Sequence, residues 1–323
     1  MAGERVLLRA DGGGKSGIGH LMRCLALADA LAIDGAKPAL WTQQCPEAVA
    51  DIYDARGYTV LKAPPREASA AWLVVDSYDI EAQERARLKT YAHHMLVIDD
   101  LGNNGPYACA LALNPNPGAR TQAYGDAKRV LAGADYVLLR KELLGTAVRR
   151  RTGRVNTILV SCGGTDPAGA APTVLEALKP LASEDMHIRV LVGVGPVQSL
   201  PADLGAARLE YVEGRFDMAA QLEWADAAIV AAGTVQWEAA YLGCPFVAVV
   251  IADNQLSGAQ NFARLGGSMH VDWRVKKDAQ SLVPTLKRLL DDDEARALQA
   301  RKAQGTIDGH GAKRVVEAMA QMV

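Results

Sequence analysis

Short apolar runs alternate along the whole chain with longer segments in which apolar residues recur every three or four positions. The first run, Arg5–Ala10, is followed by a glycine-rich loop over residues 11–19, and a helix is expected from about His20 because leucine and alanine then recur at helical spacing. A strand, a glycine loop and a helix in this order are typical of the first unit of a doubly wound parallel sheet.

The same alternation continues as far as about residue 118 and restarts near residue 157. In the first half we expect strands over Pro38–Thr42, Trp72–Asp76, Met95–Asp99 and Ala110–Leu113, and helices over Pro46–Arg56 and Ile80–Tyr91. In the second half we expect strands over Thr157–Ser161, Ile188–Val192, Ala227–Ala231 and Phe246–Ile251, and helices over Ala168–Leu181, Thr234–Leu242 and from about Ala279 onward.

A polar stretch rich in arginine, Gly145–Arg154, separates the two halves and is interpreted as a solvated linker. The pattern therefore predicts an α/β chain with two Rossmann-like domains, residues 1–148 and residues 155–323, the second ending in a helical tail. Ligands of such sheets bind beyond the carboxyl ends of the strands, so the default site is a deep cleft between the two domains.

The composition of the chain argues against nucleic-acid binding and against membrane association. The chain has 323 residues, a formal net charge of -2 and a charged fraction of 22%, without the clustered basic excess typical of nucleic-acid-binding proteins. Its five cysteines are an odd number, which favours free thiols in a reducing compartment. No leader-like segment is evident and no apolar run approaches ~20 residues, so we expect a cytoplasmic protein without stable membrane association.

The first glycine loop carries a candidate for catalysis. Gly17 and Gly19 allow close approach of backbone to a ligand, and His20 follows at the start of a helix, whose dipole disfavours the imidazolium form. A neutral imidazole in this place suits a general base, whereas the alternative is a capping or packing histidine. Lys15 and its neighbours do not form a P-loop, because Arg9 stands where that motif requires its first glycine.

The second half offers backbone sites for a diphosphate. One is the loop Gly163-Gly164-Thr165 between a strand and a helix, although glycine turns also join strands to helices without binding anything.

A second turn, Gly233-Thr234, opens a helix that carries Glu238 about one turn further on. A carboxylate there can accept both hydroxyls of a ribose, and the alternative is an acid that stabilises the helix dipole. Asn254 and Gln255 follow the last strand, where polar groups reach a cleft or merely form a turn.

No metal site and no cofactor are expected. The six histidines show no HExxH spacing, His93 and His94 are adjacent and point apart, and Asp99-Asp100 lacks the Asp-x-Asp arrangement that holds a metal-bound diphosphate.

Taken together, these segments resemble the UDP-sugar hydrolase family of pseudaminic acid biosynthesis, a relative of transferases with the glycosyltransferase-B fold. The resemblance spans nearly the whole chain and is carried by Arg9-Ala-Asp11, Gly17-Ile-Gly-His20, Arg23, Leu73-Val-Val-Asp76-Ser-Tyr78, Asp99-Asp100, Leu113-Asn114, Leu139-Arg140, Cys162-Gly-Gly-Thr-Asp166, Glu238 and Asn254-Gln255. One departure is the loop from Gly12 to Lys15, which replaces a more polar loop and leaves the sugar specificity open.

The resemblance implies hydrolysis of a UDP-linked 2,4-diacetamido-2,4,6-trideoxy sugar at C1, with inversion, to free sugar and UDP. It implies that His20 activates water and that UDP is held by Gly163, Gly164, Thr165, Gly233, Thr234 and Glu238. The residues assigned to the sugar are Asp11, Gly17, Gly19, Tyr78, Asn254 and Gln255.

The chemistry is consistent with that implication, because UDP is a good leaving group and one base plus stabilisation of the diphosphate suffice. Two other interpretations remain. One is an inverting glycosyltransferase, in which an acceptor hydroxyl replaces water. The other is a protein that binds nucleotide sugars without catalysis.

Overall fold

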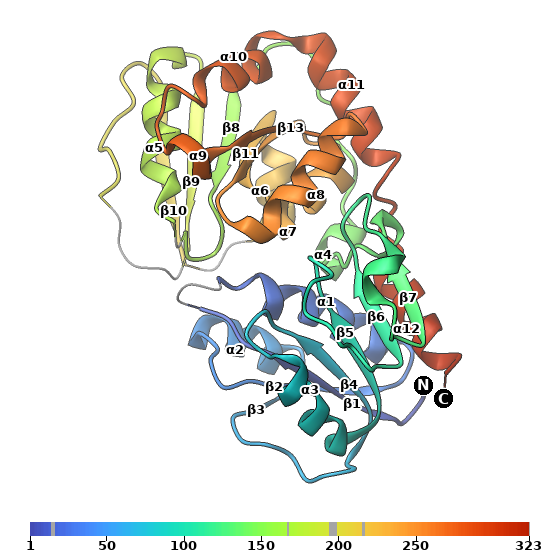
Figure 1. The fold of residues 1–323 in the computed structure, drawn as a ribbon. Helices are drawn as coiled ribbons and strands as arrows, with labels where there is room; N and C mark the ends of the chain where they lie inside the picture. Colours follow the sequence, from blue (N-terminus) through green and yellow to red (C-terminus); the bar gives the residue numbers. More distant parts are fainter. Residues whose placement is uncertain (14–16, 167, 194–198, 215–216, 323) are drawn as a thin grey trace. The chain divides into compact units, whose positions relative to one another are not determined.

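The chain forms two compact units in the computed structural model, which describes residues 1–13, 17–166, 168–193, 199–214 and 217–322. The first unit comprises Met1–Lys141 together with the chain from Gly309 onward, and the second comprises Glu142–Asp308. Each unit contains one parallel sheet with helices on its faces (Figure 1). This is the architecture of two Rossmann-like domains that the alternation predicts.

The first unit has a seven-stranded sheet within the described residues, in the order β3-β2-β1-β4-β5-β6-β7. Its strands are β1 (Arg5–Ala10), β2 (Lys37–Trp41), β3 (Thr59–Leu61), β4 (Ala70–Asp76), β5 (Ala92–Ile98), β6 (Leu111–Asn114) and β7 (Arg129–Ala132). Its helices are α1 (Gly19–Ile33), α2 (Glu47–Ala55), α3 (Ala82–Leu88) and α12 (Gly311–Ala320), and α4 (Lys141–Leu144) begins at the boundary.

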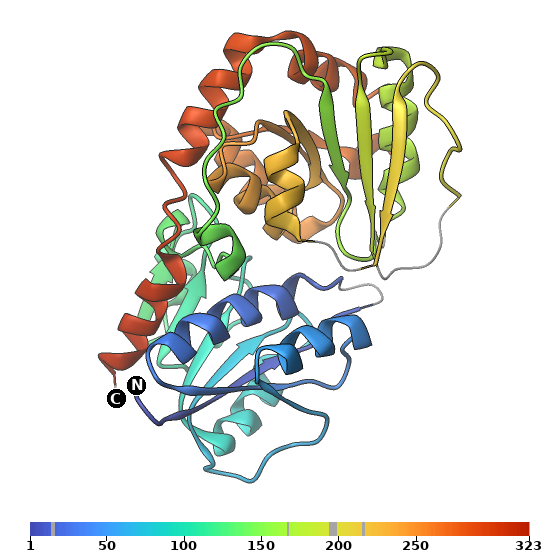
Figure 2. The same ribbon diagram turned by 180° about the vertical axis from the view of Figure 1, so that it is seen from behind.

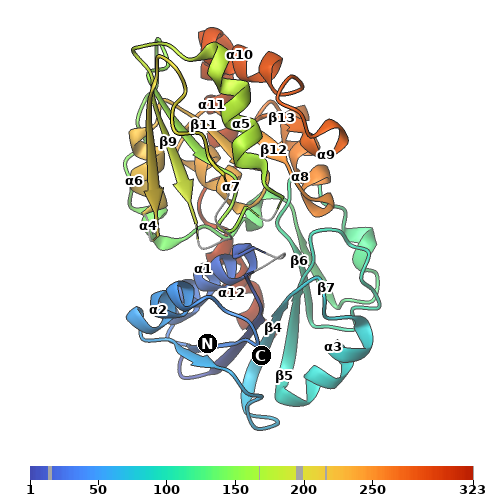
Figure 3. The same cartoon turned by 90° about the vertical axis from the view of Figure 1, so that its left-hand side faces the viewer.

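Both faces of this sheet are covered, because side chains that alternate along each strand enter two separate cores. Val6 and Leu8 of β1 belong to the core that includes α1 and α12, whereas Leu7 belongs to the core that includes Leu88 of α3. Figure 3 shows α1 and α12 on one face and α3 on the other. A strand buried on both faces reads as a continuous apolar run, which is why the central strands are evident in the sequence.

The second unit repeats the plan with a six-stranded sheet, again among the described residues, in the order β10-β9-β8-β11-β12-β13. Its strands are β8 (Thr157–Ser161), β9 (His187–Val192), β10 (Arg208–Glu213), β11 (Ala227–Ala231), β12 (Phe246–Val250) and β13 (Met269–Asp272). Its helices are α5 (Ala170–Leu178), α6 (Met218–Trp224), α7 (Thr234–Tyr241), α8 (Asp253–Arg264), α9 (Trp273–Lys276), α10 (Val283–Asp291) and α11 (Asp293–Gln304).

The last helix, α12, belongs to the first unit rather than to a tail of the second. Its apolar stripe, which includes Val315 and Met319, enters the same core as α1, and the two helices lie side by side (Figure 2). The compact units thus differ from the ranges 1–148 and 155–323, because the tail follows its buried stripe back to the first sheet and the second unit begins at Glu142.

The arginine-rich stretch is mostly exposed, as expected of a linker, but two of its arginines are anchored to the second unit. Arg151 donates hydrogen bonds to the carbonyl oxygens of Leu222 in α6, Ala225 just beyond α6 and Leu242 at the end of α7, at 2.6, 2.7 and 2.9 Å. Arg149 donates to two further carbonyls near the end of α6. Carbonyl groups at a helix C-terminus lack intrahelical partners and carry partial negative charge, so a guanidinium satisfies both needs.

We therefore expect the substitution Arg151→Ala to lower the free energy of unfolding of the second unit by about 2–3 kcal/mol. It removes charged hydrogen bonds to carbonyls at helix C-termini, which lack intrahelical donors to replace them. Thermal unfolding followed by circular dichroism should show Tm lower by roughly 5–10 °C. The matched control is Arg154→Ala, which removes an ion pair between the exposed side chains of Arg154 and Asp185 and should cost less than about 1 kcal/mol. Equal losses from both substitutions would contradict the anchoring role.

Candidate active site

The carboxyl ends of β1, β4, β5 and β6 bring a set of polar side chains together in the first unit. The chain from β1 leads into α1, which carries His20 and Arg23, while Asp76 ends β4 and Asp100 follows β5. The strand order reverses between β1 and β4, so this cluster lies at the topological switch point of the sheet, where ligands of doubly wound sheets bind.

His20 and Asp76 form a buried pair. The Nδ1 atom of His20 lies 2.6 Å from Oδ1 of Asp76, whose side chain is fully buried. Burial alone would raise the pKa of Asp76, but the charges of Arg23 and His20 and the hydrogen bonds from both hold that pKa well below its usual range. The carboxylate is therefore ionised and accepts a hydrogen bond from Nδ1 of His20, so the other ring nitrogen, Nε2, is the one that can exchange a proton with a ligand.

Arg23 joins two carboxylates. It is three residues from His20 on α1 and thus on the same face of the helix. Its guanidinium donates to both oxygens of Asp76, at 2.6 Å each, and to both oxygens of Asp100, at 2.8 and 3.0 Å. Burial would lower the pKa of Arg23, but Asp100 and Asp76 raise it above its ordinary value, so Arg23 stays charged.

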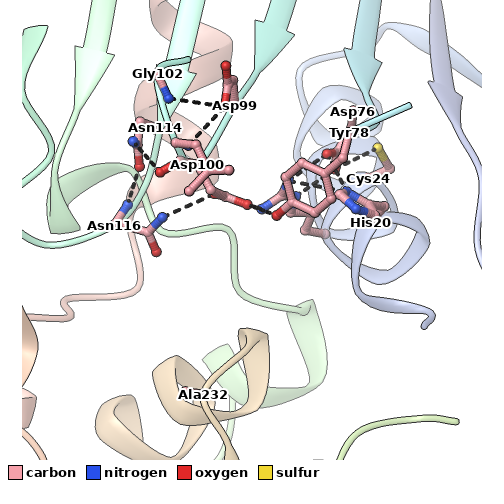
Figure 4. Close-up of polar contacts among 12 residues, drawn as sticks. His20, Cys24, Asp76, Tyr78, Asp99, Asp100, Gly102, Asn114, Asn116 and Ala232 are labelled. Atoms are coloured by element: carbon pink, nitrogen blue, oxygen red, sulfur yellow. Dashed lines mark hydrogen bonds and ion pairs between the residues drawn. The ribbon is translucent and has the colours of Figure 1, made fainter. Parts of the chain in front are cut away.

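Asp100 extends the network away from His20. It accepts hydrogen bonds from the hydroxyl of Tyr78 and from the side-chain amide of Asn116, the latter at 3.2 Å (Figure 4). The Tyr78 ring meets the His20 ring edge to face, with centroids 4.5 Å apart, and 38% of the tyrosine remains exposed. Tyr78 therefore gives the cluster an aromatic surface next to the candidate base.

Asp99 and Asn114 hold the backbone turn that carries Asp100. Asp99 accepts backbone hydrogen bonds from Leu101 and Gly102, which closes the turn after β5. Asn114, the last residue of β6, donates to the carbonyl of Asp100 at 2.9 Å. These contacts orient Asp100 towards Arg23, so Asp99 and Asn114 are structural parts of the site.

The structure buries the candidate base. His20 is 6% exposed and its Nδ1 contacts a carboxylate, a partner that the expectation based on the helix dipole did not include. From the sequence, no role in orienting the imidazole was predicted for Asp76, Arg23, Asp100 or Asn116. For Asp76 and Asp100 the available signal is position, because the carboxyl ends of neighbouring parallel strands meet at one edge.

The glycines before α1 provide close approach. Gly17 has a φ of 66°, in the left-handed region, and its carbonyl accepts a hydrogen bond from Gly13 at 2.6 Å. Gly19 begins α1, and a Cβ added there would meet open space. Backbone at this point is thus accessible to a ligand, while Lys15, which the P-loop comparison involved, lies outside the described residues together with 14 and 16.

Asp11 has a role in holding the adjacent loop. Its Oδ2 pairs with Arg9 at 2.7 Å, and its Oδ1 accepts hydrogen bonds from Thr42 and from the backbone of Gln43 and Gln44. A carboxylate with four protein partners has little capacity left for a sugar. Its assignment to the sugar stays a prediction, to which these contacts add an organising role for the loop after β2.

The second unit has its own switch point, between β8 and β11. After β8, Gly163 has a φ of 98°, and Gly163 and Thr165 line a small pocket together with Gly193 at the end of β9. A Cβ added to Gly193 would lie 1.9 Å from the carbonyl oxygen of Gly164, so this backbone approach requires glycine. Successive backbone groups in such turns form anion-binding concavities.

The two helices that follow these turns differ at their N-termini. The Asp166 carboxylate accepts hydrogen bonds from the backbone of Ala170 and Ala171, both at 2.9 Å, and so caps α5. Helix α7 begins after Gly233, and no side chain caps it in the part of the chain that the structure describes. The first turn of α7 is therefore the better place for an anion.

The remaining predicted residues lie on α7 and α8. Glu238, in the second turn of α7, is 4% exposed. Asn254 and Gln255 are in the first turn of α8 rather than in a simple turn, and Gln255 accepts a hydrogen bond from the backbone of Ile251 at 2.9 Å. Its amide nitrogen would lie 3.8 Å from a Cβ at Gly233, so Gln255 and the start of α7 are neighbours.

The described residues contain neither a metal-ligand cluster nor a membrane-spanning helix. No group of three or more His, Cys, Asp or Glu side chains there is placed to hold a metal ion. None of the helices in the described ranges is both long enough and apolar enough to cross a membrane.

Known proteins resemble the chain over nearly its full length. No protein-family model matches it. The spore coat polysaccharide biosynthesis protein SpsG of Bacillus subtilis is 24% identical, with 95% of each chain covered. Among solved structures, the calicheamicin glycosyltransferase CalG4 (TM-score 0.62, 17% identity) matches over 100% of both chains, and TcCGT1 in complex with UDP (TM-score 0.67, 10% identity) over 99% of both. The fold is therefore of the glycosyltransferase-B type.

Proposed function

We propose that the protein is an enzyme that transfers a sugar from a UDP-sugar to an acceptor hydroxyl with inversion at C1, and that His20 is the general base. The observation that carries the proposal is the His20–Asp76 pair at the switch point of the first sheet. Among the described residues, Nε2 of His20 has no hydrogen-bond partner, so its lone pair is available to take a proton from a hydroxyl.

Asp76 has two effects in this mechanism. Its carboxylate fixes the tautomer that carries the proton on Nδ1, and it stabilises the imidazolium that forms when Nε2 takes the acceptor's proton. The oxygen of the acceptor then attacks C1 as the bond from C1 to the UDP oxygen breaks. A general base of this kind contributes about 10²–10⁴-fold to a rate.

The nucleotide belongs, in this proposal, to the second unit. The uncapped start of α7 and the turn at Gly163 offer backbone N–H groups to the diphosphate, which stabilise the charge that develops on departing UDP. Glu238 is assigned to the ribose hydroxyls, and Asn254 and Gln255 to the sugar. Inversion requires that the acceptor oxygen attacks C1 from the face opposite to the departing UDP oxygen.

Transfer is preferred to hydrolysis because the solved structures that match the full chain include a glycosyltransferase, and the relative SpsG takes part in polysaccharide biosynthesis. Hydrolysis of a UDP-linked diacetamido sugar remains the second candidate, supported by the resemblance of the His20 segment. The two reactions differ only in whether the nucleophile is a hydroxyl of an acceptor or water.

The experiment is an incubation of the whole protein with a panel of UDP-sugars, in which release of UDP is measured with and without candidate acceptor sugars. Release that requires an acceptor identifies a transferase, and release in buffer alone identifies a hydrolase. A UDP-sugar that binds without any release of UDP, under all acceptors, would contradict enzymatic function and favour a binding protein.

The second unit also yields a prediction for nucleotide binding. The substitution Gly193→Ala should weaken binding of UDP at least about tenfold, because its Cβ cannot coexist with the carbonyl of Gly164 and the phosphate-binding turn must move. Isothermal titration with UDP measures the effect. Gly145→Ala is the control, since a Cβ there meets nothing within 4 Å. Unchanged affinity in Gly193→Ala would place the nucleotide elsewhere.

A further inference from the structure

The buried cluster in the first unit poses an electrostatic problem for the proposed base. An imidazole must be neutral before it can accept a proton, yet the His20 ring is held by one carboxylate, which Arg23 links to a second. Asp76 bonds its Nδ1 directly, and Asp100 is connected to Asp76 through a single guanidinium. A negative charge favours the charged form of a nearby imidazole, and charges in a buried site are only weakly screened by solvent.

Arg23 is the group that offsets these two charges. Its guanidinium makes four hydrogen bonds, two to each carboxylate, and its Nη2 atom lies 3.3 Å from Nδ1 of His20. One positive charge between two negative charges leaves the cluster with a single net negative charge beside a neutral imidazole. Without Arg23 the net charge would be two negative units.

We propose that Arg23 and Asp100 act as an opposed pair that sets the charge state of His20, with Arg23 keeping the imidazole neutral before the reaction and Asp100 limiting that effect. This inference rests on the proposed function of His20 as a base. Neither residue touches the reacting atoms, so both are positioning residues. The other groups of the cluster are Tyr78, which donates to Asp100, and the buried thiol of Cys24, 3.7 Å from Asp76.

The test uses two substitutions that should shift the titration of His20 in opposite directions. Arg23→Gln removes the positive charge, so the midpoint of the His20 imidazole should rise by roughly one to two pH units. Asp100→Asn removes one negative charge and keeps the pair of Arg23 with Asp76, so the midpoint should fall by about one unit. Disruption of structure alone gives no reason for shifts of opposite sign.

The midpoint is measured by NMR titration of the histidine ring signals in the whole, substrate-free protein. The signal of His20 is assigned by its loss in His20→Gln. Arg23→Lys should bring the midpoint back towards that of the unmodified protein, because it restores the charge without the fork geometry. The matched control is Arg56→Gln, which removes a half-buried arginine just after α2 that pairs with Asp29 of α1, the helix that carries His20, and it should leave the midpoint unchanged.

Shifts in the same direction, or no shift in Asp100→Asn, would overturn the inference. If Arg23→Gln does not fold, Asp100→Asn and Arg23→Lys still decide it. Turnover is a separate measurement: the acid limb of the pH profile should follow the midpoints if His20 is the base. If the His20 midpoint shifts in opposite directions in the two variants but the protein turns over no UDP-sugar, the role of Arg23 and Asp100 is supported and the proposed function is refuted. Failure of this inference and failure of the proposed function are therefore distinguishable.

Discussion

The substitution His20→Gln should lower turnover of a UDP-sugar by about 10³-fold, while the affinity for UDP changes less than about twofold. The loss is the contribution of a general base, which glutamine cannot replace because its amide does not accept a proton near neutral pH. Affinity for UDP should persist because the proposed nucleotide groups, at Gly163 and at the start of α7, belong to the second unit. The measurements are initial rates of UDP release and isothermal titration with UDP.

A matched control is available in the same unit. His94 of β5 stacks on Trp72 near the start of β4, with ring centroids 5.0 Å apart, whereas Asp76 lies at the end of β4. The substitution His94→Gln should therefore leave kcat unchanged within about twofold. Comparable activity of His20→Gln and the unmodified protein would remove His20 from the mechanism, even if UDP still bound.

The substitution Asp76→Asn should reduce kcat by roughly 10²–10⁴-fold, with a smaller effect on KM. Asparagine fills the same space but no longer enforces the tautomer with its lone pair on Nε2, and it no longer stabilises imidazolium. The magnitude is that of the corresponding change in other buried carboxylate–histidine pairs. A split between kcat and KM is the useful signature, because an interaction made only in the transition state affects kcat without weakening substrate binding.

Folding must be checked for this variant, since Asp76 is fully buried and pairs with Arg23. Circular dichroism and gel filtration show whether the variant is folded. The control is Asp185→Asn, which removes a carboxylate from an exposed ion pair and should leave kcat unchanged. Asp76→Asn that folds and keeps more than about a third of the original kcat is incompatible with the proposed pair.

The central strands of both sheets follow from the sequence, whereas the edge strands do not. Strands such as β4 are buried along their full length and appear as continuous apolar runs. By contrast, β3 has three residues that are exposed or half-buried, and β10 is half-buried with charged residues at both ends. Such strands form because a neighbouring strand offers hydrogen bonds, which is a property of the assembled sheet.

The candidate site shows the same division. His20 was identifiable because its glycine loop is a local pattern. The partners of His20 were not, since the bond to Asp76 spans 56 positions in sequence and the bond from Arg23 to Asp100 spans 77. Those pairings depend on β1 lying beside β4 and β4 beside β5, which the chain order alone does not dictate.

Helical periodicity also has a limit that the last helix illustrates. The apolar stripe of α12 predicts that one face is buried, but not which surface covers it. Val315 and Met319 pack with α1, near the opposite end of the sequence. The arginines before β8 posed a similar difficulty, because the carbonyls that Arg151 caps belong to residues 71 and 91 positions further along the chain.

The most direct measurement is the configuration at C1 of the first product that forms from a UDP-sugar, followed by NMR before the free sugar or acceptor product can equilibrate. A single displacement assisted by the His20–Asp76 pair predicts inversion, so an α-linked donor gives a β-configured product. Retention of configuration would contradict the account, because it requires either a covalent intermediate or attack from the face that UDP leaves.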